Sequence, residues 1–408
     1  MTTNVSRRRF LKSCAAGGCA LAAGAGVASF TRSGCAGENA EITARLGGIY
    51  QTPEARYYQK LPENRVKCVL CPNECEVGDQ ERGYCGVREN RGGTYHTLVY
   101  GNPCSRNVDP IEKKPLFHVL PGTYAYSIAT AGCNVECLFC QNWEISQVRP
   151  EQTRNFDMPP DVLVADASRL VESRFLPHPV RPRSIAFTYT EPVIYYEYVY
   201  DTAKLARERG LDSVMISNGY ITREPMEALC DVLSAVKIDL KAYTEDFYVK
   251  LVHGHLKPVL DTLQLLARKK VWFEIVYLVI PTHNDDPAKM REMAKWIHDQ
   301  LGPHVPLHLT AFFGTYKLRD LPRTSPETIE RLYDVARGEG LKFVYVGNIS
   351  APDGLPGEST YCPKCSRRVV HRIRFLVRDV QIKGGKCAHC GAEVPGLWDG
   401  LASRTRGS

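Results

Sequence analysis

Short apolar runs alternate with amphipathic stretches between Asp161 and Gly347. Counting one run just upstream, seven runs rich in β-branched and aromatic residues predict strands at 127–131, 184–189, 213–217, 236–240, 271–280, 307–313 and 343–346. Two intervening stretches, 290–301 and 329–336, space their apolar residues as a helix does, and the second follows a Ser325-Pro326 start. Repeated strand–helix units need right-handed parallel crossovers. With about six units, we predict a partial TIM-like (β/α)6 barrel in the α/β class.

Cysteine-rich segments flank this predicted core on both sides, at 68–109 and 361–398. A run rich in proline and glycine, 351–357, predicts a linker before the second segment. We therefore expect an N-terminal cysteine-rich region at 45–117, a core at 118–350 and a C-terminal module at 358–402.

Composition and charge exclude several classes of protein. The 408 residues are 44% hydrophobic and 24% charged, which argues against disordered, collagen-like and multi-span membrane chains. The net charge is +7, but four of the basic residues lie in the first thirty positions, which hold no acidic residue, and the rest of the chain carries only +3. We therefore expect no stable binding to nucleic acid or membranes.

The N-terminus resembles an export signal. Ser6-Arg7-Arg8-Arg9-Phe10-Leu11-Lys12 precedes a run of alanine and glycine that is too short and too weakly apolar to span a bilayer stably. We predict a twin-arginine signal and its tail at 1–34, and export to the periplasm or the outer face of the cytoplasmic membrane. The protein would be cytoplasmic if the signal is not used. This route carries folded proteins, which suits a metal centre assembled in the cytosol.

Directly after the first predicted core strand, Cys133, Cys137 and Cys140 follow a C-x3-C-x2-C spacing. Three thiolates from one loop can hold three irons of a [4Fe-4S] cluster and leave the fourth iron open to a chelating substrate or cofactor. The alternative is zinc with a distant fourth ligand, although common zinc sites do not use this spacing.

The C-terminal module contains two cysteine pairs separated by 21 residues, Cys362 with Cys365 and Cys387 with Cys390. Four thiolates in paired hairpins predict a closed tetrahedral site, so we expect a zinc ribbon, with rubredoxin-type iron as the alternative. Between the pairs, arginines alternate with apolar residues at Arg372, Arg374 and Arg378. A solvated strand face is favoured there over a nucleic-acid contact.

A looser set of cysteines occupies the N-terminal region at Cys68, Cys71, Cys75 and Cys85, with the spacing C-x2-C-x3-C-x9-C. This spacing favours zinc and a second iron–sulfur cluster about equally, ahead of unligated thiols.

The central motif, with the aromatic Phe139 before its last cysteine, resembles the signature of the radical S-adenosylmethionine (radical SAM) superfamily. Further motifs together resemble the AmmeMemoRadiSam system radical SAM enzyme, a family related to the pyruvate formate-lyase activating enzymes. They lie at 68–72, 109–115, 140–146, 189–192, 238–241, 280–286 and 345–348. The resemblance runs from about Leu46 to Trp398.

The resemblance implies a chemistry and a set of partners. S-adenosylmethionine would chelate the open iron, an electron from the reduced cluster would cleave its S–C5′ bond, and the 5′-deoxyadenosyl radical would take a hydrogen atom from a substrate that the sequence does not identify. The family name implies association with Memo-like and AMMECR-like proteins, and the chemistry implies a low-potential electron donor.

The same resemblance assigns residues at the C-terminal ends of predicted strands, where barrel enzymes place their sites. Cys133, Cys137 and Cys140 would bind the cluster. Thr190 and Glu191 lie where the superfamily holds the amino group of the cofactor, and positions near its ribose and carboxylate fall at Asn218, Asp239 and Lys241. A cation-binding aspartate of the activating enzymes falls at Ile216, so that site is not carried over.

Two rival functions stay open on the sequence. One is an activase of a glycyl-radical enzyme, which would act on a protein backbone. The other is a non-catalytic metalloprotein, such as an iron–sulfur electron carrier or a zinc-ribbon adaptor.

Overall fold

The computed structural model describes residues 42–172, 176, 178–349 and 356–400, all within a single unit. The predicted signal at 1–34, with Arg7 and Arg8, lies outside these residues. No helix in the described ranges is long and apolar enough to cross a membrane.

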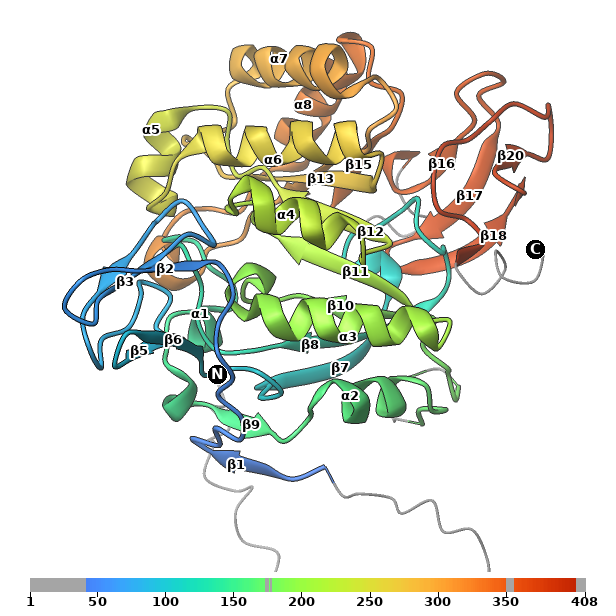
Figure 1. Ribbon diagram of the computed structural model, residues 1–408. Coiled ribbons are helices and arrows are strands. Elements are labelled where there is room, and N and C mark those ends of the chain that lie inside the picture. The colour runs from blue at the N-terminus through green and yellow to red at the C-terminus, as the bar shows by residue number, and fades with distance from the viewer. Residues whose placement is uncertain (1–41, 173–175, 177, 350–355, 401–408) are drawn as a thin grey trace, which may run out of the picture. The chain divides into compact units, whose positions relative to one another are not determined.

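An eight-stranded sheet forms the centre of this unit (Figure 1), in the order β15-β14-β13-β12-β11-β10-β8-β7. The strands are β7 (Ser105–Pro110), β8 (Tyr124–Ala129), β10 (Ser184–Phe187), β11 (Asp212–Ser217), β12 (Ala235–Asp239), β13 (Trp272–Val279), β14 (Leu307–Ala311) and β15 (Val344–Gly347). Every neighbouring pair is parallel except β7 with β8. The strands β7 and β15 are the two edges, so the sheet is an open, partial barrel. All seven predicted strands are present, and β7 is an addition.

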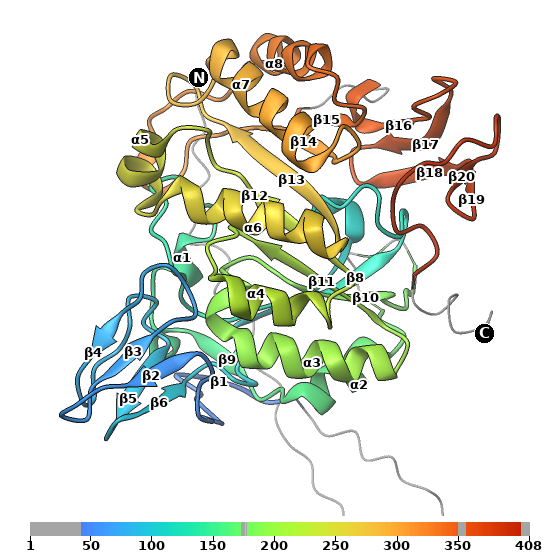
Figure 2. The same ribbon diagram turned by 45° about the horizontal axis from the view of Figure 1, so that its top comes forward.

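Helices follow the parallel strands β8 to β14, which confirms the predicted α/β class. They are α1 (Trp143–Ser146), α2 (Pro160–Ala167), α3 (Tyr196–Glu208), α4 (Arg223–Cys230), α5 (Glu245–Phe247), α6 (Leu256–Lys269), α7 (Pro287–Trp296) and α8 (Pro326–Gly338). α2 packs beside α3, α4 beside α6 and α7 beside α8 (Figure 2). At the start of α8, the Ser325 hydroxyl accepts a hydrogen bond from the Thr328 N–H at 3.2 Å, as the Ser-Pro start predicts.

Apolar burial explains why the predicted strands form where they do. β8, β10 and β11 are buried along almost their whole length, as expected for parallel strands that helices cover. The two predicted helices bury one stripe each, and α7 continues into a π-helical turn, η6 (Ile297–Leu301).

Small antiparallel sheets make up the N-terminal region. β2 (Tyr58–Lys60), β3 (Val66–Cys68) and β4 (Glu76–Val77) form one sheet, and β5 (Arg88–Arg91) with β6 (Thr94–Thr97) forms a hairpin. β1 (Ala44–Leu46) pairs with β9 (Arg154–Phe156).

The C-terminal module consists of two further antiparallel sheets. One contains β16 (Thr360–Tyr361), β17 (Arg368–Ile373) and β18 (Leu376–Val380), and the other contains β19 (Ile382–Lys383) and β20 (Lys386–Cys387).

The prediction of a solvated arginine face on this module is wrong for Arg372. Its side chain is buried beside the equally buried Glu112, at 3.6 Å, and donates to the Phe117 carbonyl at 2.5 Å. Phe375, one of the apolar residues that alternate with these arginines, lies between β17 and β18 and is 48% exposed. Arg372 lies two residues after the buried Val370 in β17 and therefore shares its face, while the register shift skips Arg378 of β18 and leaves the alternation within β17 unchanged.

Candidate functional site

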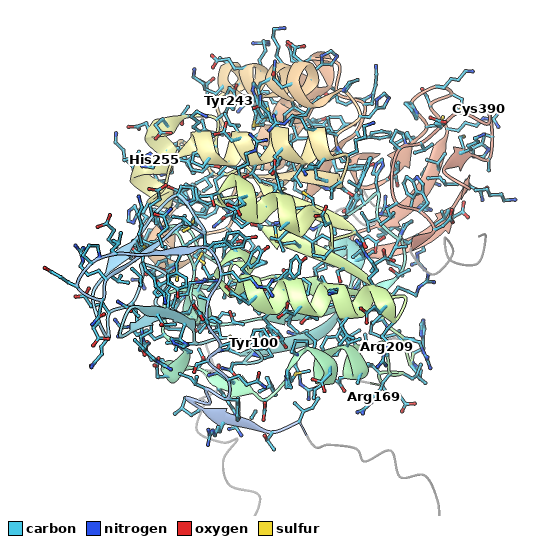
Figure 3. All side chains as sticks on the ribbon, in the orientation of Figure 1. Tyr100, Arg169, Arg209, Tyr243, His255 and Cys390 are labelled. Atoms are coloured by element: carbon cyan, nitrogen blue, oxygen red, sulfur yellow. The ribbon has the colours of Figure 1, made fainter. Side chains whose placement is uncertain are left out.

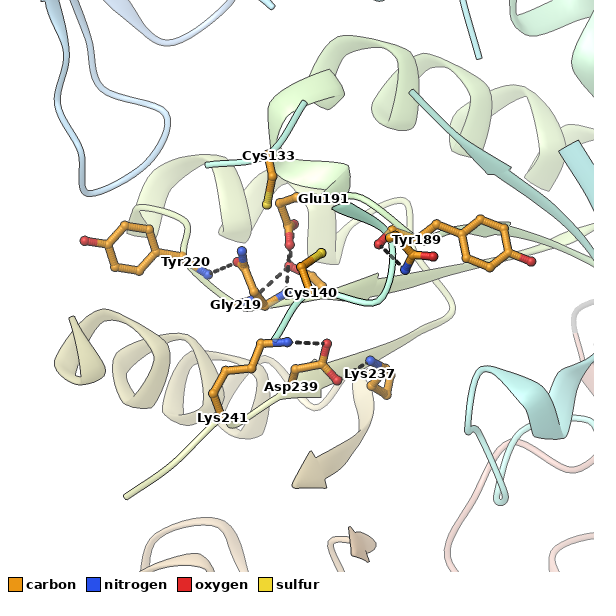
Figure 4. Close-up of polar contacts among 12 residues, drawn as sticks. Cys133, Cys140, Tyr189, Glu191, Gly219, Tyr220, Lys237, Asp239 and Lys241 are labelled. Atoms are coloured by element: carbon orange, nitrogen blue, oxygen red, sulfur yellow. Dashed lines mark hydrogen bonds and ion pairs between the residues drawn. The ribbon is translucent and has the colours of Figure 1, made fainter. Parts of the chain in front are cut away.

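The residues that the sequence assigns to cluster and cofactor meet at the C-terminal ends of neighbouring parallel strands. The cysteine loop follows β8, Glu191 follows β10, Asn218 follows β11 and Lys241 follows β12. Since parallel strands end at one edge of the sheet, these side chains converge, and Figure 4 shows Cys133 and Cys140 beside Glu191, with Lys241 and Asp239 below them.

Backbone hydrogen bonds fix the shape of the cysteine loop. The Glu136 N–H donates to the Val252 carbonyl at 3.1 Å and the Leu138 N–H to the Leu251 carbonyl at 2.9 Å, so the loop lies along the π-helical turn η5 (Tyr248–Val252). The Phe139 ring packs against that of Phe247, with 5.7 Å between their centroids. The aromatic residue of the motif therefore anchors the loop.

Gly132, which sequence reasoning missed, lets the loop pack closely against the N-terminal region. Its φ is +92°, and a Cβ there would lie 2.6 Å from the Cys85 carbonyl oxygen and 2.7 Å from Val87. A larger residue is excluded by both conformation and space. The only sequence signal is a glycine directly before the first cysteine.

The three loop thiols fit an iron–sulfur cluster better than a single ion. Cys137 is buried, and Cys133 and Cys140 are half-buried. Burial raises the pKa of the Cys137 thiol to about 12, although the nearby Lys241 ammonium opposes the shift. Three thiols from one loop, with no fourth thiol in the same motif, are a soft donor set that fits three corners of a [4Fe-4S] cluster.

Glu191 is buried and joins the ends of β10 and β11. One carboxylate oxygen accepts from the Val193 N–H at 3.0 Å and the Ser217 hydroxyl at 2.7 Å, and the other accepts from the Asn218 N–H at 2.8 Å. Burial raises the Glu191 pKa to about 7, while these hydrogen bonds oppose the rise. Ser217 was not predicted as a site residue, and its position just before Asn218 is the only signal for it.

Thr190 and Asn218 already have protein partners. The Thr190 hydroxyl donates to the Thr130 carbonyl at 2.8 Å. The Asn218 amide donates to the Asn134 side chain at 2.8 Å, which ties the end of β11 to the cysteine loop. Ordinary strand-end polar groups look like this, so a cofactor contact of either residue stays a prediction.

Asp239 lies between two lysines at the end of β12. It forms ion pairs with Lys237 and with Lys241, the latter at 3.0 Å. Burial alone would raise the Asp239 pKa, but the two ammonium groups outweigh it and hold the pKa at about 2. Lys237 was missed, although a lysine between Val236 and Ile238 in a buried strand is itself a signal of a polar partner.

A second buried ion pair comes from the 109–115 motif. The Lys114 ammonium contacts Asp109 at 2.7 Å, and the Tyr189 hydroxyl donates to the same carboxylate at 2.5 Å. Burial lowers the Lys114 pKa to about 8, against the opposing charge of Asp109. The motif therefore supplies a buried cation on the segment that links β7 to β8.

A cleft of about 780 Å³ opens beside Cys133. Residues 76–89 of the N-terminal region line one side, and residues of the cysteine loop and of 146–152 line the other. The cluster loop thus borders a space large enough for a small molecule.

The four C-terminal cysteines lie at metal-binding distances. The sulfurs of Cys362 and Cys390 are 3.6 Å apart, those of Cys365 and Cys387 are 3.8 Å apart, and all four lie within 4.8 Å of one another. Zn–S bonds of about 2.3 Å give a tetrahedral edge of about 3.8 Å. A tetrahedral set of four sulfurs suits zinc or iron, and Figure 3 shows Cys390 at the outer part of this module.

Comparisons with known proteins show what the chain is similar to. Residues 127–297 match the radical SAM superfamily. Over 343 residues, the chain is 41% identical to the uncharacterized protein MJ0808 of Methanocaldococcus jannaschii, which covers 84% of this chain and 98% of that protein. It is 23% identical over 229 residues to the pyruvate formate-lyase 1-activating enzyme of Escherichia coli K12, covering 52% of this chain and 89% of that enzyme. A crystal structure of a radical SAM methyltransferase from Sphaerobacter thermophilus aligns with a TM-score of 0.43 and 18% identity, over 54% of this chain and 66% of that one.

Proposed function

The chain belongs to the radical SAM superfamily, and from this premise we propose that it is an enzyme that cleaves S-adenosylmethionine on a cluster held by Cys133, Cys137 and Cys140. When bound, the [4Fe-4S] cluster and S-adenosylmethionine supply a 5′-deoxyadenosyl radical that abstracts hydrogen from the substrate. The observation that carries the proposal is the three-thiol loop at the strand ends, beside Glu191 and Lys241.

The residues around the loop have distinct roles in this proposal. Glu191 is a buried carboxylate at the strand ends and would bind the ammonium group of S-adenosylmethionine, while Ser217 and the backbone orient it. Lys241 would bind the carboxylate of the cofactor, and Asp239 holds the Lys241 ammonium in place. Thr190 and Asn218 would complete the cofactor-binding edge, and Asn218 would bind near the ribose.

An EPR experiment tests the proposal. In the reconstituted, reduced protein, adding S-adenosylmethionine should change the cluster signal, because the cofactor binds the open iron. The Glu191→Gln variant should need more cofactor for the same change, by roughly ten- to hundredfold, since a hydrogen bond to a charged group is worth about 1.5–3 kcal/mol. A cluster signal that no concentration of cofactor alters would favour the electron-carrier alternative.

The likeness to an activating enzyme favours a second candidate function. The matched enzyme has 89% of its length covered, so a glycyl-radical activase is the alternative. Incubation with a glycyl-radical enzyme should then produce the glycyl radical signal. If the 5′-deoxyadenosyl radical takes hydrogen only from a small molecule and never from a glycyl-radical enzyme, this alternative is wrong.

The proposal also includes the narrower family within the superfamily, the cellular location and the partner proteins. The motifs at 68–72 and 109–115 support the AmmeMemoRadiSam system, and with it association with Memo-like and AMMECR-like proteins and a low-potential electron donor. Co-purification with those proteins tests the association.

We infer zinc in the C-terminal module and twin-arginine export. Changing Arg7 and Arg8 to Lys should trap the precursor in the cytoplasm, and a wholly cytoplasmic wild type would contradict export.

A further inference from the structure

The N-terminal cysteines come together from the β3–β4 hairpin and from the segment before β5. Cys68 ends β3, Cys71 and Cys75 lie in the turn before β4, and Cys85 lies just before β5. The Cys68 N–H donates to the Cys75 carbonyl at 2.9 Å, which closes this turn. All four cysteines line one small, largely enclosed cavity.

The surroundings of these four thiols differ from those of the zinc-type set. The C-terminal sulfurs lie within 4.8 Å of one another, as the ligands of one tetrahedral ion must. The N-terminal thiols line a cavity together with the buried Tyr95 and Arg88 side chains. The four thiolates of a cubane bind different irons around a shared core, so a common cavity lined by all four thiols and by polar groups favours a cluster over zinc.

The cavity also holds a polar group that has no partner. The Tyr95 side chain is fully buried, lines the cavity, and its hydroxyl finds no hydrogen-bond partner among the described residues. The hydroxyl and the Cys75 sulfur lie beside the same residue, since a Cβ on Gly83 would be 2.6 Å from the one and 3.6 Å from the other. Buried hydroxyls are nearly always hydrogen-bonded. A sulfide or thiolate of a cluster would supply the missing acceptor.

Two further donors surround this cavity. The Tyr84 N–H donates to the Cys75 sulfur at 3.3 Å. The Arg88 guanidinium is buried, lines the cavity and pairs with Glu197 at 2.6 Å. Hydrogen bonds to sulfur and nearby charge are the means by which proteins set the potential of iron–sulfur clusters.

The N-terminal cysteines are adjacent to the central loop. The Cys85 carbonyl packs against Gly132, and the Asn73 amide donates to the Asn134 carbonyl at 2.8 Å. Asn134 lines the small cavity, and Cys85 and Cys133 both line the larger cleft. Residues of the N-terminal cysteine set and of the central loop therefore line the same two cavities.

From these observations we infer that Cys68, Cys71, Cys75 and Cys85 hold a second, fully ligated [4Fe-4S] cluster that passes electrons to the central one. A low-potential one-electron donor reduces this cluster by one electron, the electron moves to the central cluster, and the second cluster returns to its oxidised level. The relay role rests on the proposed function, while the presence of the cluster does not.

Metal analysis of the full chain, reconstituted without oxygen from ferrous iron and sulfide, tests the inference. The wild type should hold about eight irons, and the Cys71→Ser/Cys75→Ser variant about four, with a signal that S-adenosylmethionine still alters. The matched control Cys230→Ser, a cysteine in α4 outside both sets, should leave the iron content unchanged. A wild type with about four irons, or zinc lost from the double variant in place of iron, would overturn the second cluster.

Two further variants separate this inference from the proposed function. The Cys133→Ala/Cys137→Ala/Cys140→Ala variant should keep about four irons and give a reduced signal that S-adenosylmethionine does not affect. Tyr95→Phe keeps every ligand but removes a donor, so it should lower the reduction potential of that remaining signal. An unchanged potential contradicts the placement of the cluster at Tyr95. If S-adenosylmethionine does not alter the EPR signal of the central cluster in the wild type, only the proposed function is refuted.

Discussion

Removing the charge of Asp239 should destabilise the fold and reveal how strongly the site relies on buried ion pairs. Asp239→Asn leaves the ammonium groups of Lys237 and Lys241 without the carboxylate that both contact. Breaking a buried pair costs about 3–5 kcal/mol, because the remaining charge stays desolvated. The Asp239 side chain retains 26% exposure, so we expect the lower end, about 3 kcal/mol, or roughly a hundredfold in the unfolding equilibrium.

The stability that Asp239→Asn loses relative to the wild type should depend on pH in a defined direction. Burial already lowers the Lys237 pKa, and loss of the Asp239 charge lowers it further. Between that folded-state pKa and the unfolded value of about 10.4, the unfolded state binds more protons, so the stability of the variant rises with pH. The difference in free energy of unfolding between the wild type and the variant should therefore become smaller from pH 7 to pH 10.

Urea unfolding of the metal-free chain, followed by circular dichroism, measures both effects. The matched control is Asp246→Asn, which removes the same charge from an exposed i,i+4 pair with Lys250 at 2.6 Å. That change should cost under about 0.5 kcal/mol. An Asp239→Asn variant that is no less stable than the Asp246→Asn control, or a deficit that does not narrow toward pH 10, would refute the reasoning.

Three further outcomes are expected. Gly132→Ala should lower the thermal stability and the iron content of the reconstituted protein, because its Cβ would meet the Cys85 carbonyl, whereas Gly338→Ala, in α8 with open space around it, should lower neither. Arg372→Met should destabilise the chain to urea by about 3 kcal/mol, because it leaves the buried Glu112 carboxyl without its cationic partner, and adding Glu112→Gln should restore part of this loss. Cys362→Ser/Cys365→Ser should remove about one zinc per chain while the iron content stays constant, and iron loss instead would assign iron to that module.

Local patterns predicted much of the architecture. Apolar runs located the parallel strands, and the Ser325-Pro326 start located α8, because burial and capping depend on neighbours in the sequence. Cysteine spacing predicted the C-terminal four-sulfur group for the same reason, since each pair lies in one tight turn.

Partners that are distant in the chain could not be predicted. The contact of Gly132 with Cys85, the burial of Lys237 beside Asp239 and the hydroxyl of Ser217 on Glu191 arise only when strands and loops pack together. Arg372 was misplaced because its buried partners, Glu112 and the Phe117 carbonyl, are distant in the chain, and alternation alone does not reveal them.

The most direct test of the account is the product of S-adenosylmethionine in the reduced protein. Without oxygen, and with the clusters reconstituted and a strong reductant present, the wild type should form 5′-deoxyadenosine and methionine slowly even without substrate. The Cys137→Ala variant should form neither, because one of the loop thiolates is missing. If the fully loaded, reduced wild type yields no 5′-deoxyadenosine with or without the expected partner proteins, the radical-enzyme function is contradicted.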